Sequence, residues 1–312
     1  MAVSEEITGS DTAGEGKAPE VDPLSVATGG VTSHVLPTDP RFAAQWHLLN
    51  SSQPGVDLNV TSVWDEFTGA GVLVAAMDEG FEYTHPDLAG QYRTDLDFDA
   101  AADDDDAAPV LGGSDHSHGT PVLGMIAGQI DGAGSVGVAP GADVTGFRVE
   151  FNSSNTTFQA DLVQSYQAAL ANGVDVLNNS WGYINPFSDN FENPTNAAMA
   201  QALEDLALDG RGGLGTAVTF SAGNSGHQGD NVNYNSLSNS PYTITVGAIH
   251  SGGANAYFST PGAAVLVTAP GMGVLLPDRV GSNGYASGDY AGLNGTSFSA
   301  PAVAGVIALM LE

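Results

Sequence analysis

The stretch Val72-Leu-Val-Ala-Ala-Met-Asp78 places a short, fully apolar run directly before a carboxylate. Such a run is typical of a strand that is buried on both faces of a parallel sheet. Comparable runs follow at Val174–Leu177, Ala217–Phe220 and Thr243–Val246, and helical segments separate them. This alternation predicts an α/β fold, with a mostly parallel sheet between helices on both faces.

The helices are expected at Gln159–Asn172, Pro194–Asp209 and Ala302–Leu311. The first two carry apolar side chains every three or four residues and precede a glycine, which commonly ends a helix; the third is apolar throughout. Residues 1–33 are acidic and polar without periodicity, which predicts a disordered leader. Residues 34–312 contain no linker or internal repeat and are expected to form one domain.

The composition limits the partners. Asp and Glu number 36 against 6 Lys and Arg, which gives a net charge of −30. Like charge opposes binding to nucleic acid and to anionic membrane surfaces. No apolar run is long enough to insert into a membrane, and the start lacks the features of a secretory signal. The absence of cysteine excludes disulfides, thiolate metal sites and a cysteine nucleophile.

Reactive side chains stand where this fold places functional groups, at the carboxyl ends of strands and the starts of the helices that follow. Asp78 follows the first apolar run, His118 precedes a helical stretch, and Ser297 precedes the last helix. An imidazole can take the proton of a serine hydroxyl while a carboxylate orients the ring. Asn224, which follows Ala217–Phe220, could donate a hydrogen bond to the resulting oxyanion.

Each of these residues also has an ordinary structural interpretation. An aspartate at a strand end commonly caps or turns the chain, and Gly295-Thr-Ser297 is a plausible helix start. The order Asp, His, Ser along the chain is more informative, because it is one of the orders in which serine triads occur. The surroundings of Ser297 do not form Gly-x-Ser-x-Gly, which disfavours the α/β-hydrolase arrangement.

Eight motifs in order resemble the subtilisin-like serine proteases, and within them the kexin and furin-like branch. They lie between residues 37 and 312, nearly the whole chain after the leader. The motifs are Thr38-Asp-Pro-Arg-Phe-Ala-Ala-Gln-Trp46, Met77-Asp-Glu-Gly-Phe-Glu-Tyr-Thr-His-Pro-Asp-Leu88, His118-Gly-Thr120, Val136-Gly-Val-Ala-Pro140, Asn179-Ser-Trp-Gly182, Ser221-Ala-Gly-Asn224, Gly229-Asp-Asn-Val-Asn-Tyr234 and Gly295-Thr-Ser-Phe-Ser-Ala-Pro301.

The resemblance implies a three-layer subtilisin-like fold and a monomeric endopeptidase that acts on protein or peptide substrates. The catalytic residues are then Asp78, His118, Ser297 and Asn224. The residues that line the cleft, and pair with the backbone of an extended peptide, are Ser180, Trp181 and Gly182.

Calcium is the cofactor that the resemblance implies, and its preferred ligands are carboxylate and carbonyl oxygens. The first expected site uses the side chains of Asp39, Asp87 and Asp131 and the carbonyls of Gly128, Ala133 and Ser135. The second uses Asp99, Asp104 and Asp106, although that aspartate-rich stretch could equally be a solvated acidic loop. Asp230 is a candidate for a third site near the specificity pocket.

The specificity positions match the kexin-like branch only in part. Glu79 and Asp115 match acidic positions of its second pocket, whereas Asn185 and Asn235 stand where its first pocket has aspartates. An amide cannot neutralise a buried lysine or arginine as a carboxylate does. We therefore expect a weakened dibasic rule, with basic residues near the cut still favoured by the negative field of the whole protein.

Two other interpretations stay open at this point: a catalytically inactive relative kept as a binding module, and a different hydrolase such as an esterase or glycosidase. Asp78 and Glu79 are adjacent on a strand and point to opposite faces, which makes them a poor acid–base pair. Because the chain stops at Glu312, the catalytic domain is expected to be incomplete at its C-terminus. Calcium dependence and an acidic surface suit an extracellular location.

Overall fold

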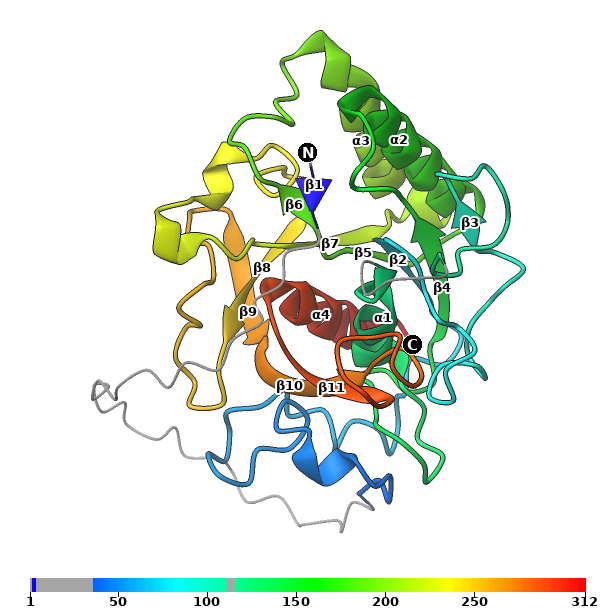
Figure 1. Ribbon diagram of the computed structural model, residues 1–312, viewed down its shortest axis with the longest axis vertical. Helices are drawn as coiled ribbons and strands as arrows, with labels where there is room; N and C mark the ends of the chain where they lie inside the picture. The colour runs from blue at the N-terminus through cyan, green and yellow to red at the C-terminus, as the bar shows by residue number, and fades with distance from the viewer. Residues whose placement is uncertain (1, 4–35, 111–115) are drawn as a thin grey trace.

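The computed structural model describes residues 2–3, 36–110 and 116–312 (Figure 1). A seven-stranded sheet in the order β3-β4-β2-β5-β7-β8-β9 forms its centre, and all neighbouring strands are parallel. Its strands are β2 (Leu73–Asp78), β3 (Phe98–Asp99), β4 (Asp143–Arg148), β5 (Val176–Asn179), β7 (Ala217–Ser221), β8 (Ile244–Ile249) and β9 (Val265–Pro270).

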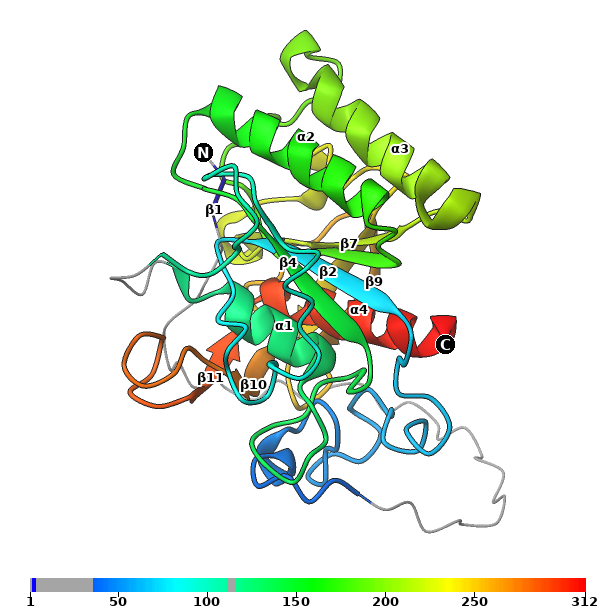
Figure 2. The same ribbon diagram turned by 90° about the vertical axis from the view of Figure 1, so that its right-hand side faces the viewer.

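Helices cover both faces of this sheet. Figure 2 shows α2 (Asn155–Ala171) and α3 (Ala197–Gly213) on one face, and α1 (Gly119–Ala127) and α4 (Thr296–Leu311) on the other. The expected α/β architecture with a mostly parallel sheet is confirmed. Within the described residues, no helix combines the length and apolar character needed to cross a bilayer.

Strand β2 explains why the sheet has two cores. Side chains alternate between the two faces of a strand, so a strand buried on both faces must be apolar at every position. Val74 and Ala76 belong to the core that contains α1 and α4, whereas Ala75 and Met77 belong to the core under α2 and α3. The apolar run before Asp78 therefore places β2 in the interior of the sheet.

The hairpin and the shortest strands have no clear periodic signal in the sequence. An antiparallel pair is formed by β10 (Met272–Pro277) and β11 (Tyr290–Asn294), and a second by β1 (Ala2–Val3) and β6 (Gly182–Tyr183). The 3-10 turns are η1 (Phe42–Ala44), η3 (Pro194–Asn196), η4 (Gly226–Gln228) and η5 (Val232–Tyr234). The predicted leader lies outside the described residues except for β1.

All three expected helices differ from the expectation at their boundaries. Helix α2 starts at Asn155, four residues before the expected Gln159, and ends at Ala171. The helix expected from Pro194 starts with the turn η3, and α3 extends to Gly213 across a kink in which Arg211 has a left-handed backbone. Helix α4 starts at Thr296, six residues before the expected start, and therefore includes Pro301. A proline in the first turns removes an N–H while the helix continues.

Candidate active site

Asp78 and His118 meet at the carboxyl edge of the sheet. Asp78 ends β2 and His118 is the N-cap of α1, and both side chains are fully buried. The imidazole Nδ1 lies 3.0 Å from Oδ1 and 2.9 Å from Oδ2 of the carboxylate. A carboxylate at Nδ1 keeps the proton of the neutral ring on that nitrogen, so Nε2 becomes the basic nitrogen.

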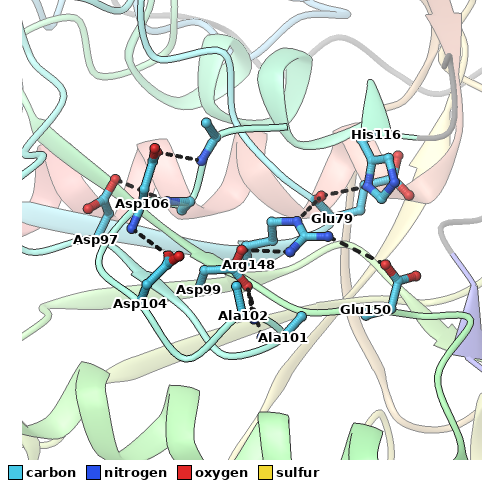
Figure 3. Close-up of polar contacts among 12 residues, drawn as sticks. Glu79, Asp97, Asp99, Ala101, Ala102, Asp104, Asp106, His116, Arg148 and Glu150 are labelled. Carbon is cyan, nitrogen blue, oxygen red and sulfur yellow. Dashed lines mark hydrogen bonds and ion pairs between the residues drawn. The ribbon is translucent and has the colours of Figure 1, made fainter. Parts of the chain in front are cut away.

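Glu79 supports this pair rather than lying open in a pocket. Its side chain is buried, its N–H donates to Asp78 Oδ1 at 2.8 Å, and its Oε1 accepts from the His118 N–H at 3.2 Å. Its carbonyl accepts from Arg148 Nε at 3.2 Å and lies 3.0 Å from His116 Nδ1 (Figure 3). Asp115, its predicted partner in the second pocket, lies outside the described residues.

Ser297 lies in the first turn of α4 and is tied to Ser180. Its hydroxyl donates to the Ser180 carbonyl at 3.1 Å, and the Ser180 hydroxyl donates to the Ser297 carbonyl at 2.7 Å. Pro301 has no N–H for the carbonyl four residues earlier, which is that of Ser297. The Ser180 hydroxyl therefore satisfies an acceptor that the helix itself leaves open, and it fixes the start of α4.

The ring of Phe298, the next residue of α4, lies 5.6 Å from the His118 ring between centroids. Asn224 reaches the same helix start. Its side-chain oxygen accepts from the N–H and the hydroxyl of Thr296, at 2.9 and 3.0 Å. This contact leaves the amide NH₂ as the donor end of Asn224, beside the positive end of the α4 dipole.

The predicted cleft residues follow β5. Trp181 is buried, and its ring packs edge-on against Phe158 and Phe220, so only its backbone is placed to line a cleft. Gly182 starts β6, which already pairs antiparallel with β1 in the register Ala2↔Tyr183 and Val3↔Gly182. This strand edge therefore accepts an extended segment.

A pocket lies between β6 and the residues after β7. Its lining residues include Gly182, Asp189, Ala222, Gly223, Asp230 and Asn235. Asn235, which was predicted for the first pocket, is among these lining residues, whereas Asn185, predicted with it, is exposed and is not part of the lining. Asp189, which sequence comparison with the branch did not single out, is buried in the wall. Asp230 lines the pocket too, and its Oδ1 accepts from the Asn231 N–H at 2.8 Å.

Two of the residues predicted for the first calcium site, Asp39 and Asp87, are buried carboxylates. Asp131, predicted with them, accepts from the Ala133 N–H at 2.9 Å, and no cluster of three such side chains forms among the described residues. Asp39 Oδ1 accepts from the N–H groups of Asp131 and Gly132, both at 3.2 Å, while its Oδ2 is buried and has no hydrogen-bond partner in the described part of the chain. Asp87 Oδ2 accepts from the N–H and hydroxyl of Ser135 at 2.9 and 2.7 Å. Both carboxylates thus hold the loop that supplies the predicted carbonyls of Gly128, Ala133 and Ser135.

The second predicted calcium site does not assemble. Asp99 Oδ2 lies 2.6 Å from Arg148 Nη1, and its Oδ1 accepts from two backbone N–H groups (Figure 3). Asp104 and Asp106 are exposed and accept from the N–H groups two residues onward. Among the described residues, no three His, Cys, Asp or Glu side chains cluster as metal ligands do. Arg148 and the local N–H groups thus occupy the oxygens that a calcium ion would need.

A buried carboxylate, an imidazole and a helix-start serine at the carboxyl edge of a parallel sheet are the parts of a serine-hydrolase site. The model of the Subtilase family, Peptidase_S8, matches residues 69–312. This chain belongs to the subtilase family, as the sequence motifs predict.

Two curated relatives are named for the processing of other proteins. The chain is 34% identical to the dibasic-processing endoprotease of Schizosaccharomyces pombe, over 90% of this chain and 38% of that protein. It is 35% identical to human proprotein convertase subtilisin/kexin type 7, over 88% of this chain and 35% of that protein. The chain thus spans little more than a third of the length of these relatives.

Solved structures agree with the fold. The serine protease of Aeromonas sobria superposes with a TM-score of 0.78 at 27% identity, over 90% of this chain and 56% of that chain. A cold-adapted subtilisin-like serine proteinase superposes with a TM-score of 0.60 at 26% identity, over 79% of this chain and 77% of that chain. Both likenesses support the three-layer arrangement of helices around the sheet.

Proposed function

We propose that this protein is a serine endopeptidase in which Asp78, His118 and Ser297 form the triad and Asn224 donates to the oxyanion. The observation that carries this proposal is the fully buried Asp78–His118 pair, with carboxylate-to-Nδ1 distances of 2.9 and 3.0 Å, beside the helix start that holds Ser297. Membership of the subtilase family and the names of the relatives support the same reaction class.

The proposed reaction starts when the Ser297 hydroxyl turns from the Ser180 carbonyl and attacks the scissile carbonyl carbon. Its proton passes to His118 Nε2, and the Asp78 carboxylate stabilises the imidazolium that forms. The Asn224 NH₂ and the N–H groups at the start of α4 donate to the new oxyanion. His118 then protonates the leaving amine, and water repeats the sequence to release the acyl group from Ser297.

The proposed substrate is an extended segment of a protein or peptide. Strand β1 pairs with β6 in an antiparallel register, and a chain in this register runs toward Ser180, whose carbonyl contacts Ser297 Oγ. Main-chain hydrogen bonds of this kind bind any extended sequence, so side-chain pockets must supply the selectivity.

We also propose that calcium binds between Asp39 and Asp87. The Asp39 Oδ2, which is buried without a hydrogen-bond partner among the described residues, fits a bound cation, and oxygen ligands are those that calcium prefers. Asp131, Gly128, Ala133 and Ser135 would complete the ligand set. Calcium would stabilise the structure by joining residue 39 to the loop 128–135. Such a calcium-stabilised, acidic protease suits an extracellular location.

Digestion of an unfolded protein such as casein tests the proposal, with products identified by mass spectrometry. We expect cleavage at internal bonds, and the variant Asn224→Ala should lower kcat by about 100- to 1,000-fold with little change in KM. A matched variant on an exposed face of α3, Asp209→Asn, should retain the parent kcat. Removal of terminal residues alone, or an unchanged kcat in Asn224→Ala, would contradict the proposed role.

A further inference from the structure

The loop that follows β6 carries exposed apolar side chains that the proposed reaction does not use. Ile184 and Phe187 are 53% and 62% exposed, and Tyr234 in η5 is 39% exposed. The rings of Phe187 and Tyr234 lie 5.5 Å apart between centroids, in a tilted arrangement. We name Ile184, Phe187 and Tyr234 the β6 rim. Large apolar side chains that gather on a surface commonly mark a binding site.

The backbone holds Phe187 in this exposed position. Its φ of 64° lies in the left-handed region, which is unfavourable for a bulky residue. The Phe187 N–H donates to the Tyr234 carbonyl at 2.8 Å, and the Ser188 N–H donates to the Asn185 carbonyl at 3.3 Å. These hydrogen bonds join the loop to η5 and maintain the strained conformation. Strain that is kept where the ring stays largely in solvent points to a functional role for that ring.

Strand β6 determines which part of a substrate reaches the β6 rim. Its partner β1 runs antiparallel, with Val3 opposite Gly182 (Figure 1). Successive residues of a peptide in this register lie opposite successive residues of β6 in reverse order. Ser180, whose carbonyl accepts from Ser297 Oγ, would lie opposite the residue directly before the cut. The residue opposite Ile184 is then the fifth before the cut, and its side chain lies on the same face as that of Ile184.

The pocket beside β6 does not compete for this role. Its free volume is about 20 Å³, which is room for one water molecule and not for a large side chain. Asp189 and Asn235 line this pocket, and they are near neighbours of Phe187 and Tyr234 along the chain. The β6 rim therefore lies beside the pocket, where a substrate side chain can bind without entering it.

We propose that the β6 rim is a specificity subsite that receives an apolar side chain of the substrate at the fifth residue before the cut. The proposal rests on the endopeptidase function proposed above. An apolar side chain that covers Ile184 and Phe187 removes their surface and its own from water, which strengthens substrate binding. The three side chains of the rim carry no charge at neutral pH, so an apolar residue gains more there than a polar or charged one.

Two internally quenched peptides that differ only at the fifth residue before the cut test the proposal, one with leucine and one with asparagine, which is of similar size. Their common sequence is taken from a bond cleaved in casein, and mass spectrometry verifies that both are cut at that bond. We expect the unmodified protein to favour leucine by about tenfold in kcat/KM. Because the contact lies away from the scissile bond, the difference should appear in KM rather than in kcat.

A double variant removes the apolar surface without adding backbone strain. Ile184→Asn combined with Phe187→Gly should bring the leucine-to-asparagine ratio close to one. Glycine adopts the left-handed conformation at residue 187 without strain, so the double variant should retain the Tm of the unmodified protein. The matched control is Leu208→Asn, which removes an exposed apolar side chain from α3 and should preserve the ratio.

The outcomes separate this inference from the proposed function. Equal kcat/KM for the two peptides in the unmodified protein overturns the role of the β6 rim, and this result does not depend on any variant folding. A leucine preference that the double variant retains also overturns it, because the preference would then arise elsewhere. Failure to cleave casein and both peptides, in protein with a cooperative unfolding transition, would instead contradict the endopeptidase function.

Discussion

Asp78 and Asp99 stand at the same level of the same sheet, yet their partners give them different roles. Both align with Arg148 across β4, Asp78 from β2 and Asp99 from β3. Asp99 pairs with the Arg148 guanidinium, whereas Asp78 pairs with the His118 imidazole. Arginine stays protonated in proteins, while histidine exchanges its proton near neutral pH. The partner, rather than the carboxylate, therefore separates the structural pair from the pair that we propose to be catalytic.

Replacing Asp78 and Asp99 separately by asparagine should give the largest difference between the two pairs. Asp78→Asn should lower kcat by about 10⁴-fold, because an amide no longer favours the productive tautomer of His118 or stabilises its charged form. Asp99→Asn should leave kcat within about threefold, because Arg148 takes no part in proton transfer. Steady-state kinetics on an internally quenched peptide give both values. Losses of similar size in the two variants would remove the distinction.

Removing the arginine should affect stability rather than chemistry. Arg148→Met leaves Asp99 buried without its cation, which typically costs about 3–5 kcal/mol of unfolding free energy. Adding Asp99→Asn to Arg148→Met should restore much of the loss. The matched control is Arg93→Met, because the Arg93–Asp95 pair is exposed to solvent, where ion pairs contribute little to stability. Urea unfolding measures all three variants, and equal losses from the two arginines would be inconsistent with a structural role for Arg148.

Asp39 is a third kind of carboxylate, whose open oxygen we assign to calcium. Calcium at about 100 times its dissociation constant should stabilise the protein by about 2.7 kcal/mol, which appears as a higher Tm. Asp39→Asn should abolish that increase, whereas Asp104→Asn in the acidic stretch should retain it. A calcium-dependent Tm that Asp104→Asn removes would restore the second predicted site.

The smallest effect is expected at Asp97, which forms no ion pair with a described residue. Burial raises its pKa from 3.8 to about 6, the Tyr92 hydroxyl opposes this change, and Asp106 and Asp105 add to it. The native state thus retains a proton that the unfolded chain releases between about pH 4 and 6. This group makes stability fall as pH rises through that interval. Asp97→Asn should flatten that part of the profile in unfolding measurements at pH 4, 5 and 6, and an unchanged slope would contradict the raised pKa.

The sequence predicts the residues whose place follows from periodicity and motif order. The apolar run before Asp78 correctly predicts an interior strand, and the expectation that strand ends and helix starts meet brings Asp78, His118 and Ser297 to one edge. Acidic clustering is a poorer guide, because it does not reveal that Arg148 reaches Asp99 across β4. The number of acidic residues in a segment does not show which carboxylate forms an ion pair, or which residue is its partner.

Asp189 illustrates why the lining of the pocket beside β6 could not be predicted from periodicity and motif order. Position-by-position comparison with the kexin-like branch points to Asn185, which the structure leaves exposed on the surface. The loop after β6 instead directs a residue four positions later into the pocket, where the Leu237 N–H holds it. Loop conformation decides which of several polar residues becomes buried, and the sequence carries no periodic signal for such a segment.

Covalent labelling of Ser297 tests the central claim most directly. A fluorophosphonate probe reacts with a serine hydroxyl that a neighbouring histidine activates, and peptide mapping locates the modified residue. The account predicts one labelled site, Ser297, with labelling abolished in Ser297→Ala and strongly slowed in Asp78→Asn but not in Asp99→Asn. Labelling at another serine, or none in folded protein, would contradict an Asp78–His118–Ser297 triad.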